Sequence, residues 1–234
     1  MTNIKKISDF NFKSKKVLVR VDLNVPIKNG IVADATRIKA ILPTLNQISR
    51  KGGICIIISH FGKPKGKKIE MYSLKKIVKP LSKYLGKKVF FCHYCYGNKV
   101  IQIINKLKPG EYLLLENLRF HKEETENNKN FAKKLSKFSD IYINDAFSVS
   151  HRMHASIDQI TKFLPSGIGI NMKNEKNNLE KYLLRPKKPT MAIIGGAKME
   201  NKINVLKKLL TKCNFLVLGG GIANTFLKAN KINI

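Results

Sequence analysis

The chain of 234 residues contains no tryptophan, only four cysteines and only 15 acidic residues. Four cysteines are too few for a disulfide scaffold of this length, which favours a reducing, cytoplasmic setting. No run of about 18 apolar residues is present, so we expect no membrane-spanning helix and no membrane partner. No apolar segment follows the first residues, so no secretory signal is visible. The hydrophobic content of 43% is that of a globular protein.

The shortage of acidic residues leaves a net charge of +30. Such a charge raises the question of nucleic acid. The lysines are spread along the whole chain, however, and no basic block is interleaved with aromatic residues. We therefore do not expect nucleic acid as a partner and keep a basic nucleic-acid-binding protein only as a lesser alternative. Cys92-His93-Tyr94-Cys95 resembles half of a metal site, but without a second cysteine pair we expect no metal.

Arginine is also scarce, at six of the 45 basic positions. Four of the six, Arg20, Arg37, Arg119 and Arg152, lie in or beside polar clusters that follow apolar runs. Where lysine serves for solubility, a retained arginine indicates a need for its planar, bidentate fork, which matches carboxylates and phosphates. The alternative is a set of ordinary surface ion pairs.

Six apolar runs end in such polar clusters, which is typical of buried parallel strands that bring ligand-binding residues to one edge of a sheet. The runs end at Arg20, Ile58, Leu115, Ile143, Ile194 and Leu218, and a seventh at Cys92 lacks a polar tail. Helical patterns lie between them, over residues 34–50, 74–85, 129–138 and 200–212 and from Ile222 onward. This alternation predicts an α/β fold, a doubly wound Rossmann-like parallel sheet with flanking helices.

The domain organisation follows from a polar, helix-prone region over residues 171–184 and the proline-containing segment after it. We expect a first domain over residues 1–170, a hinge helix and linker over 171–188, and the start of a second Rossmann-like domain over 189–234. Two strands and two helices leave their apolar faces without cover, so we expect this second domain to be incomplete.

Two groups of polar residues point to anion binding. Arg20, Asp22 and Asn24 alternate along an extended segment and face one side, either as a ligand site or as a structural network. His60-Phe61-Gly62-Lys63 follows the next strand, and the glycine permits close backbone approach to a ligand, although a lone histidine is more often structural.

A second anion site is expected near Gly195-Gly196-Ala197-Lys198, with Lys202 one turn later on the same helical face. The segment is not a Walker A loop. Gly219-Gly220-Gly221 is a weaker signal whose alternative is a tight turn. A basic basin and a phosphate cradle together suggest phosphoryl transfer across a cleft.

These motifs together resemble the phosphoglycerate kinase family over residues 17–226. The resemblance implies two Rossmann-like domains joined by a helical hinge, and reversible glycolytic phosphoryl transfer between 1,3-bisphosphoglycerate and MgADP, giving 3-phosphoglycerate and ATP. It also implies that ATP or ADP binds with Mg²⁺. We expect a monomer.

The resemblance assigns residue roles by position. It implies catalytic roles for Arg20 and Lys198. The residues implied to bind the triose substrate are Asp22, Leu23, Asn24, Arg37, His60, Phe61, Gly62, Lys63, Arg119, His151 and Arg152. The residues implied to bind nucleotide are Gly196, Lys198, Lys202, Gly219 and Gly220.

Three departures from the family pattern matter. Lys63 stands where the family usually has arginine, and Ser148 where it commonly has glycine. The family's later Trp-Asn-Gly-Pro segment and its Gly-Gly-Gly-Asp magnesium site do not occur in the sequence. A truncated, non-catalytic 3-phosphoglycerate-binding remnant is therefore the main alternative to an active kinase.

Overall fold

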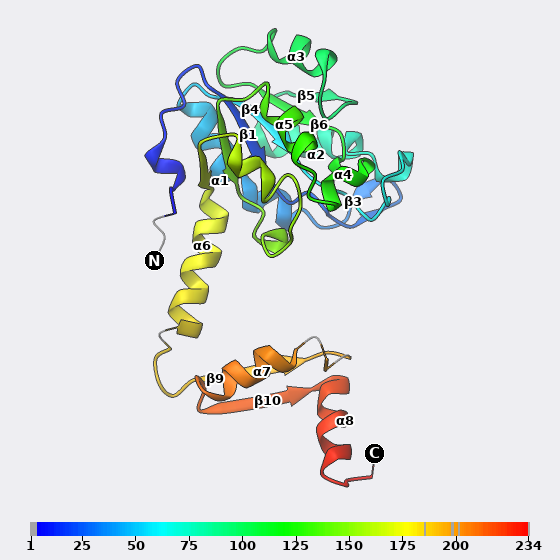
Figure 1. Cartoon of the computed structure of the whole chain (residues 1–234), viewed down its shortest axis with the longest axis vertical. Coiled ribbons are helices and arrows are strands. Elements are labelled where there is room, and N and C mark those ends of the chain that lie inside the picture. Colours follow the sequence, from blue (N-terminus) through cyan, green and yellow to red (C-terminus); the bar gives the residue numbers. More distant parts are fainter. Residues whose placement is uncertain (1–3, 185, 198, 201, 234) are drawn as a thin grey trace. The chain divides into compact units, whose positions relative to one another are not determined.

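The computed structural model describes residues 4–184, 186–197, 199–200 and 202–233. The chain divides into two compact units, Met1–Asn174 and Glu175–Ile234. Figure 1 shows the helices and strands of each. Among the described helices, none combines the length and the hydrophobicity needed to cross a bilayer.

A six-stranded sheet with only parallel neighbours forms the centre of the first unit. Its strands are β1 (Lys16–Arg20), β4 (Ile54–Ile58), β5 (Val89–Cys92), β6 (Tyr112–Leu115), β7 (Ile141–Asn144) and β8 (Ser166–Ile168). Their order is β5-β6-β4-β1-β7-β8, so the chain leaves β1 first to one side and later returns to its other side. Ligands of such sheets bind beyond the carboxyl ends of the strands at this switch point.

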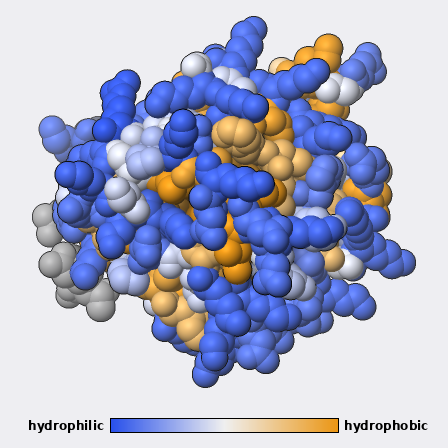
Figure 2. Space-filling view, turned by 90° about the horizontal axis from the view of Figure 1, so that it is seen from above, coloured by the Kyte–Doolittle hydropathy of each residue, from blue (hydrophilic) through white to orange (hydrophobic). Residues whose placement is uncertain are grey.

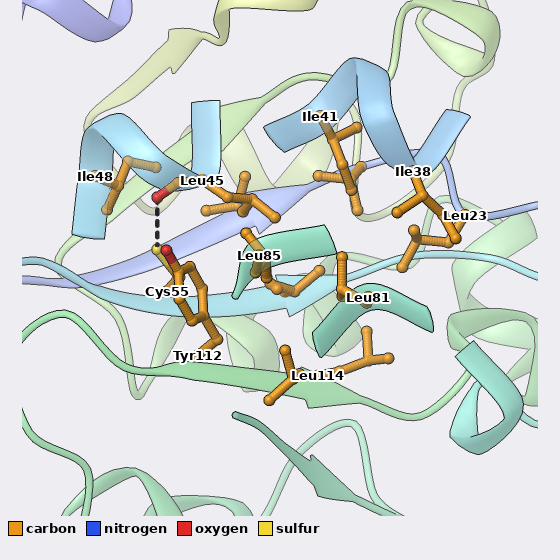
Figure 3. Packing of buried hydrophobic residues seen from close by; sticks show 14 of the residues in the cluster. Leu23, Ile38, Ile41, Leu45, Ile48, Cys55, Leu81, Leu85, Tyr112 and Leu114 are labelled. Atoms are coloured by element: carbon orange, nitrogen blue, oxygen red, sulfur yellow. Dashed lines mark hydrogen bonds between the residues drawn. The ribbon is translucent and has the colours of Figure 1, made fainter. Parts of the chain in front are cut away.

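Helices cover both faces of this sheet, which confirms the predicted doubly wound α/β architecture. Helices α1 (Thr36–Arg50) and α2 (Lys75–Leu85) pack on one face, and α3 (Asn98–Ile104) and α5 (Lys129–Ser136) on the other. Figure 3 shows the first layer, where Ile38, Ile41 and Leu45 of α1 lie against Leu81 and Leu85 of α2. Each such buried side chain contributes about 1.5–3 kcal/mol relative to an exposed one.

Shorter elements connect these layers. They are the 3₁₀ turns Ile7–Asp9, Glu70–Tyr72, Leu118–Phe120, Phe147–Val149 and Gln159–Lys162, and the short helix α4 (Lys122–Thr125). A hairpin of β2 (Ile27–Lys28) and β3 (Ile31–Val32) was not predicted. Its signal is Asn29-Gly30, whose φ angles of 50° and 77° are those of a two-residue hairpin turn.

The helix ends differ in detail from the predictions. Helix α1 begins at Thr36, two residues after the predicted start at residue 34, and Ala35 is its N-cap residue. The Asp34 carboxylate accepts the Thr36 N–H at 2.8 Å, a local turn before the helix. Pro43 lies inside α1, which continues through it as one helix.

The second unit pairs two parallel strands, β9 (Met191–Gly195) and β10 (Phe215–Gly219). Helix α6 (Ile170–Leu179) and a π-helical turn (Glu180–Leu184) precede them, and α7 (Ile203–Leu210) and α8 (Gly220–Ala229) follow the two strands. Helix α7 thus begins three residues later than expected and α8 two residues earlier. One face of the sheet exposes four apolar side chains by 42–74%, those of Met191, Ile193, Phe215 and Val217.

The outer surface is mostly polar. Figure 2 shows one face of the molecule, on which hydrophilic side chains dominate and apolar residues form small patches. This is what the high lysine content predicts for a face in contact with water.

Asp145, directly after β7, fastens the sheet to the start of α6. Its Oδ1 accepts the Met172 N–H at 2.9 Å, and the residue is only 1% exposed. Within the part of the chain that the structure describes, Oδ2 of this carboxylate has no hydrogen-bond partner. Burial raises the pKa of Asp145 to about 6, against smaller opposing effects of Thr44 and backbone N–H groups.

We expect Asp145→Asn to be more stable than the parent chain at pH 7.5 by on the order of 2 kcal/mol, and to lose this advantage by about pH 4. The folded pKa lies above the unfolded one, so the ionised carboxylate costs folding free energy above pH 6. That cost vanishes once both states are protonated. Urea unfolding across this pH range measures the difference, and a pH-independent difference would contradict the expectation.

Candidate functional site

The polar tails of β1, β4, β6 and β7 meet at the carboxyl edge of the sheet and form a basic crevice. Strand register places Arg20 beside Ile58 on one side and Asn144 on the other. The residues that follow these strands therefore approach one another although they lie far apart in sequence.

Arg20 is a fully buried charge of the crevice, with no exposed surface. Its Nε donates to Ser156 Oγ at 3.0 Å, its Nη2 lies 3.2 Å from His60 Nδ1, and its Nη1 donates to the Val21 carbonyl. Burial lowers the pKa of Arg20, while the negative charge of Glu124 raises it. Arg20 thus holds the network together, and its burial argues against the expectation that it touches a ligand itself.

Asp22 accepts hydrogen bonds from three residues at the mouth of the crevice. Its Oδ2 accepts from Arg37 Nη1 at 2.6 Å and from Ser148 Oγ at 2.5 Å, and its Oδ1 accepts the Asn24 N–H at 2.9 Å. The Arg37 side chain is 48% exposed. Its guanidinium is therefore held at one edge by Asp22 and retains donors that can reach a ligand.

The loop after β4 is fixed by side chains from the segments that follow two other strands, β1 and β6. Gly62 donates its N–H to Asn24 Oδ1 at 2.9 Å and accepts from Arg119 Nη1 at 2.8 Å. Asn117 binds both the N–H and the carbonyl of Phe61. Gly62 has a φ of +60°, and a Cβ added there would collide with the ring of Tyr72. Only glycine fits this turn without displacement.

His60 is 4% exposed and lies near enough to four guanidinium groups for their charges to act on it. Burial lowers the pKa of His60, and the positive charges of the four arginines lower it further; they are Arg20, Arg119, Arg152 and Arg37. His60 is therefore neutral at physiological pH. The structure thus brings together the four arginines that the sequence singled out.

A cavity of about 340 Å³ opens beside this group. Its lining residues are Lys63, Lys65, Gly66, Arg119, Lys122, Thr125, Glu126 and Arg152. Arg119 is 7% exposed, and among the described residues none accepts a hydrogen bond from its Nε. Five cations against one carboxylate make this cavity suitable for a phosphate-sized anion.

The remaining expected residues of the first unit contribute less directly. Leu23 has no exposed surface, and Phe61 is 8% exposed, so their side chains serve packing and their backbones hold the loops. His151 is exposed. The pKa of nearby His154 is lowered to about 4, mainly by burial and then by the positive charge of Arg119.

Sequence reasoning missed several residues of the network. They are Ser59, Lys65, Asn117, Lys122, Glu124, Ser148 (noted only as a departure) and Ser156. Ser59, Asn117 and Glu124 lie within or close to the polar segments that follow the strands. This position was the sequence signal that could have identified them. Nothing in the sequence indicates that Ser156 meets Arg20 across 136 positions.

In the second unit, glycine-rich turns follow β9 and β10 and lie against each other. A Cβ on Gly220 would lie 3.4 Å from the Gly196 backbone, and one on Gly221 would lie 3.1 Å from the Ala197 carbonyl. Lys202 Nζ donates to the Gly195 carbonyl. Contrary to expectation, Lys202 precedes helix α7 rather than lying on it.

These glycine turns are the part of the second unit expected to hold the phosphates of ATP or ADP. Their open backbone and the Lys202 ammonium suit nucleotide phosphates. Lys198 lies outside the described residues. No cluster of three or more acidic, histidine or cysteine side chains suited to a metal ion occurs among the residues described. The described donors thus fit nucleotide phosphates.

Fold and site together define a Rossmann-like α/β protein with a basic crevice at the carboxyl edge of its sheet. The family model for phosphoglycerate kinase matches residues 7–234. The chain belongs to the phosphoglycerate kinase family.

Curated relatives agree with this assignment. The chain is 51% identical to the phosphoglycerate kinase of Wolbachia pipientis from Culex pipiens, over all of this chain and 59% of that protein. It is 48% identical to the Brucella melitensis enzyme, over 97% of this chain and 58% of that one. The chain thus spans somewhat more than half the length of the curated relatives it matches.

Solved structures give the same result. The chain resembles the phosphoglycerate kinase of Coxiella burnetii with a TM-score of 0.85 and 36% identity, covering 99% of this chain and 58% of that one. It resembles the Pyrococcus horikoshii enzyme with a TM-score of 0.89 and 33% identity, covering 97% and 58%.

We expect Gly62→Ala to destabilise the chain more than Gly30→Ala, by about 1–3 kcal/mol. Both glycines have positive φ, +60° and +77°, and so share the backbone strain of the substitution. Only at Gly62 does the methyl group meet a neighbour, whereas nothing lies within 4 Å of a Cβ at Gly30. Urea unfolding of the two variants compares them directly, and equal losses would refute the close approach to Tyr72.

Proposed function

We propose that the basic crevice of the first unit binds 3-phosphoglycerate and 1,3-bisphosphoglycerate. The observation that supports this most is the convergence of four guanidinium groups around a neutral, buried His60. Such a density of fixed positive charge favours a ligand with several negative charges, which a small phosphorylated acid supplies.

The chemistry of the donors assigns a part of the ligand to each region. The cavity lined by Arg119, Arg152 and Lys63 takes the phosphate group, because five of its lining residues are cations and only one is a carboxylate. The Asp22 carboxylate repels an anion, but it can accept a hydrogen bond from the substrate hydroxyl. Arg37 is half exposed beside Asp22 and is the guanidinium best placed to contact the carboxyl end, where the transferred group is attached.

We further propose that the chain takes part in reversible phosphoryl transfer. The bond between phosphorus and the carboxyl oxygen of 1,3-bisphosphoglycerate breaks as a bond to the terminal phosphate oxygen of ADP forms, and no residue becomes covalently modified. The glycine turns after β9 and β10, with Lys202 and Lys198, would hold the nucleotide phosphates. The residues described contribute alignment and charge neutralisation, which is most of what this reaction needs.

Arg20 has a different role in this proposal from the catalytic contact that the resemblance implies. Its three groups of donors are already engaged and it has no exposed surface. We propose that Arg20 orients His60, and that Arg37 makes the direct contact.

We expect Arg37→Ala to weaken binding of 3-phosphoglycerate by roughly 10- to 100-fold, as the loss of charge-assisted hydrogen bonds implies. Arg50→Ala is the matched control, since Arg50 is the exposed arginine at the other end of the same helix. Calorimetric titration of the 234-residue chain measures both. An equal effect of the two substitutions would show that only overall charge matters.

The same titrations separate the alternative functions. An active kinase binds both 3-phosphoglycerate and ATP and turns them over, whereas a non-catalytic remnant binds the triose alone. A nucleic-acid-binding protein instead binds DNA or RNA with a steep salt dependence and without competition from 3-phosphoglycerate.

A further inference from the structure

A buried chain of hydrogen bonds leads from Glu124 to the histidine of the crevice. Glu124, Ser156 and Arg20 have no exposed surface, and His60 is 4% exposed. The four residues come from α4, the segment after the 147–149 turn, β1 and the tail of β4. None of the roles implied for the site involves Glu124 or Ser156.

The direction of each hydrogen bond in this chain is determined by chemistry. Arginine can only donate, so Arg20 Nε donates to Ser156 Oγ at 3.0 Å. The single hydroxyl proton of Ser156 is then directed to Glu124 Oε1, at 2.6 Å. The Ser156 N–H donates to the other oxygen of the same carboxylate at 3.0 Å. Glu124 therefore accepts on both oxygens, as an ionised carboxylate does.

The other end of Arg20 determines the protonation of His60. Nη2 of Arg20 donates to His60 Nδ1 at 3.2 Å, so Nδ1 carries no proton. A neutral imidazole with an accepting Nδ1 carries its proton on Nε2. Among the described residues none accepts a hydrogen bond from Nε2, so this N–H is available to an oxygen of a ligand.

We infer that Glu124 is a positioning residue which, through Ser156 and Arg20, holds His60 as the tautomer that donates from Nε2 to the substrate. This rests on the proposed binding of 3-phosphoglycerate for its last step only. The buried charge of Arg20 needs a compensating anion, and Asp22, the other nearby carboxylate, is already paired with Arg37.

Helix α4 connects the buried network with the wall of the basic cavity. Glu124 faces the buried network, while its neighbours Lys122 and Thr125 line the basic cavity. The backbone carbonyl of Glu124 also accepts the Ala155 N–H at 2.9 Å. The same short helix therefore contributes to the cavity wall and to the orientation of His60.

The test uses the full chain labelled with ¹⁵N-histidine. Long-range ¹H–¹⁵N spectra report which ring nitrogen of His60 carries the proton, and His60→Gln identifies its signals among those of the five histidines. We expect the parent chain to show an unprotonated Nδ1 and a protonated Nε2. In Glu124→Gln both nitrogen shifts should move toward a mixture of tautomers, and 3-phosphoglycerate should bind roughly tenfold more weakly.

Two further variants keep the outcome decisive. Ser156→Ala preserves both charges and removes only the linking hydroxyl, so it tests the connection if Glu124→Gln does not fold. Glu123→Gln changes the adjacent, half-buried carboxylate and should leave the His60 signals unchanged. Parent-like His60 signals in both folded network variants, or a protonated Nδ1 in the parent chain, would overturn the inference. Tautomer changes without any triose binding would support the network and refute the proposed function.

Discussion

A guanidinium group without exposed surface is the constraint on which the crevice depends. Arg20 must have acceptors for its N–H groups and a negative charge nearby, because an unpaired buried charge is far costlier than any single hydrogen bond is worth. Ser156, the Val21 carbonyl and His60 provide the acceptors, and Glu124 provides the charge. These interactions of Arg20 hold together four segments that are distant in sequence. The site is therefore organised before any ligand binds.

This organisation explains how positive charges can accumulate without a ligand. Arg37 is balanced by Asp22, and Arg20 by Glu124. Arg119 has only a backbone carbonyl as acceptor for its Nη1, and its Nε faces no acceptor among the described residues. The imbalance is therefore concentrated at Arg119, Arg152 and the lysines of the cavity. Among the described residues, the positive charges inside the crevice are thus paired with carboxylates, and those that line the cavity are not. Such a site is suited to bind an anion in its cavity.

The strands of the sheet were predictable because their apolar runs are continuous and end in polar clusters, as in Ile54–Ile58. The short strand Ser166–Ile168 has no such run, and its place at the sheet edge is set by tertiary contacts. The arginines of the site were predictable from composition and position. The contacts of Ser156 and Ser148 were not, because a serine carries no signal until the fold brings an arginine or an aspartate to it.

The scarcity of arginine proved to be the most informative compositional feature, and geometry shows why. Arg20 uses three directions of its fork at once, and Arg119 binds the Gly62 carbonyl while it faces the cavity. A lysine ammonium has a single centre and cannot connect partners at such separations. Lys63 occupies a position where no such connection between several partners is made among the described residues. It is exposed and lines the cavity, outside the hydrogen bonds that hold Arg20, so a lysine in place of the family's usual arginine leaves the buried network intact.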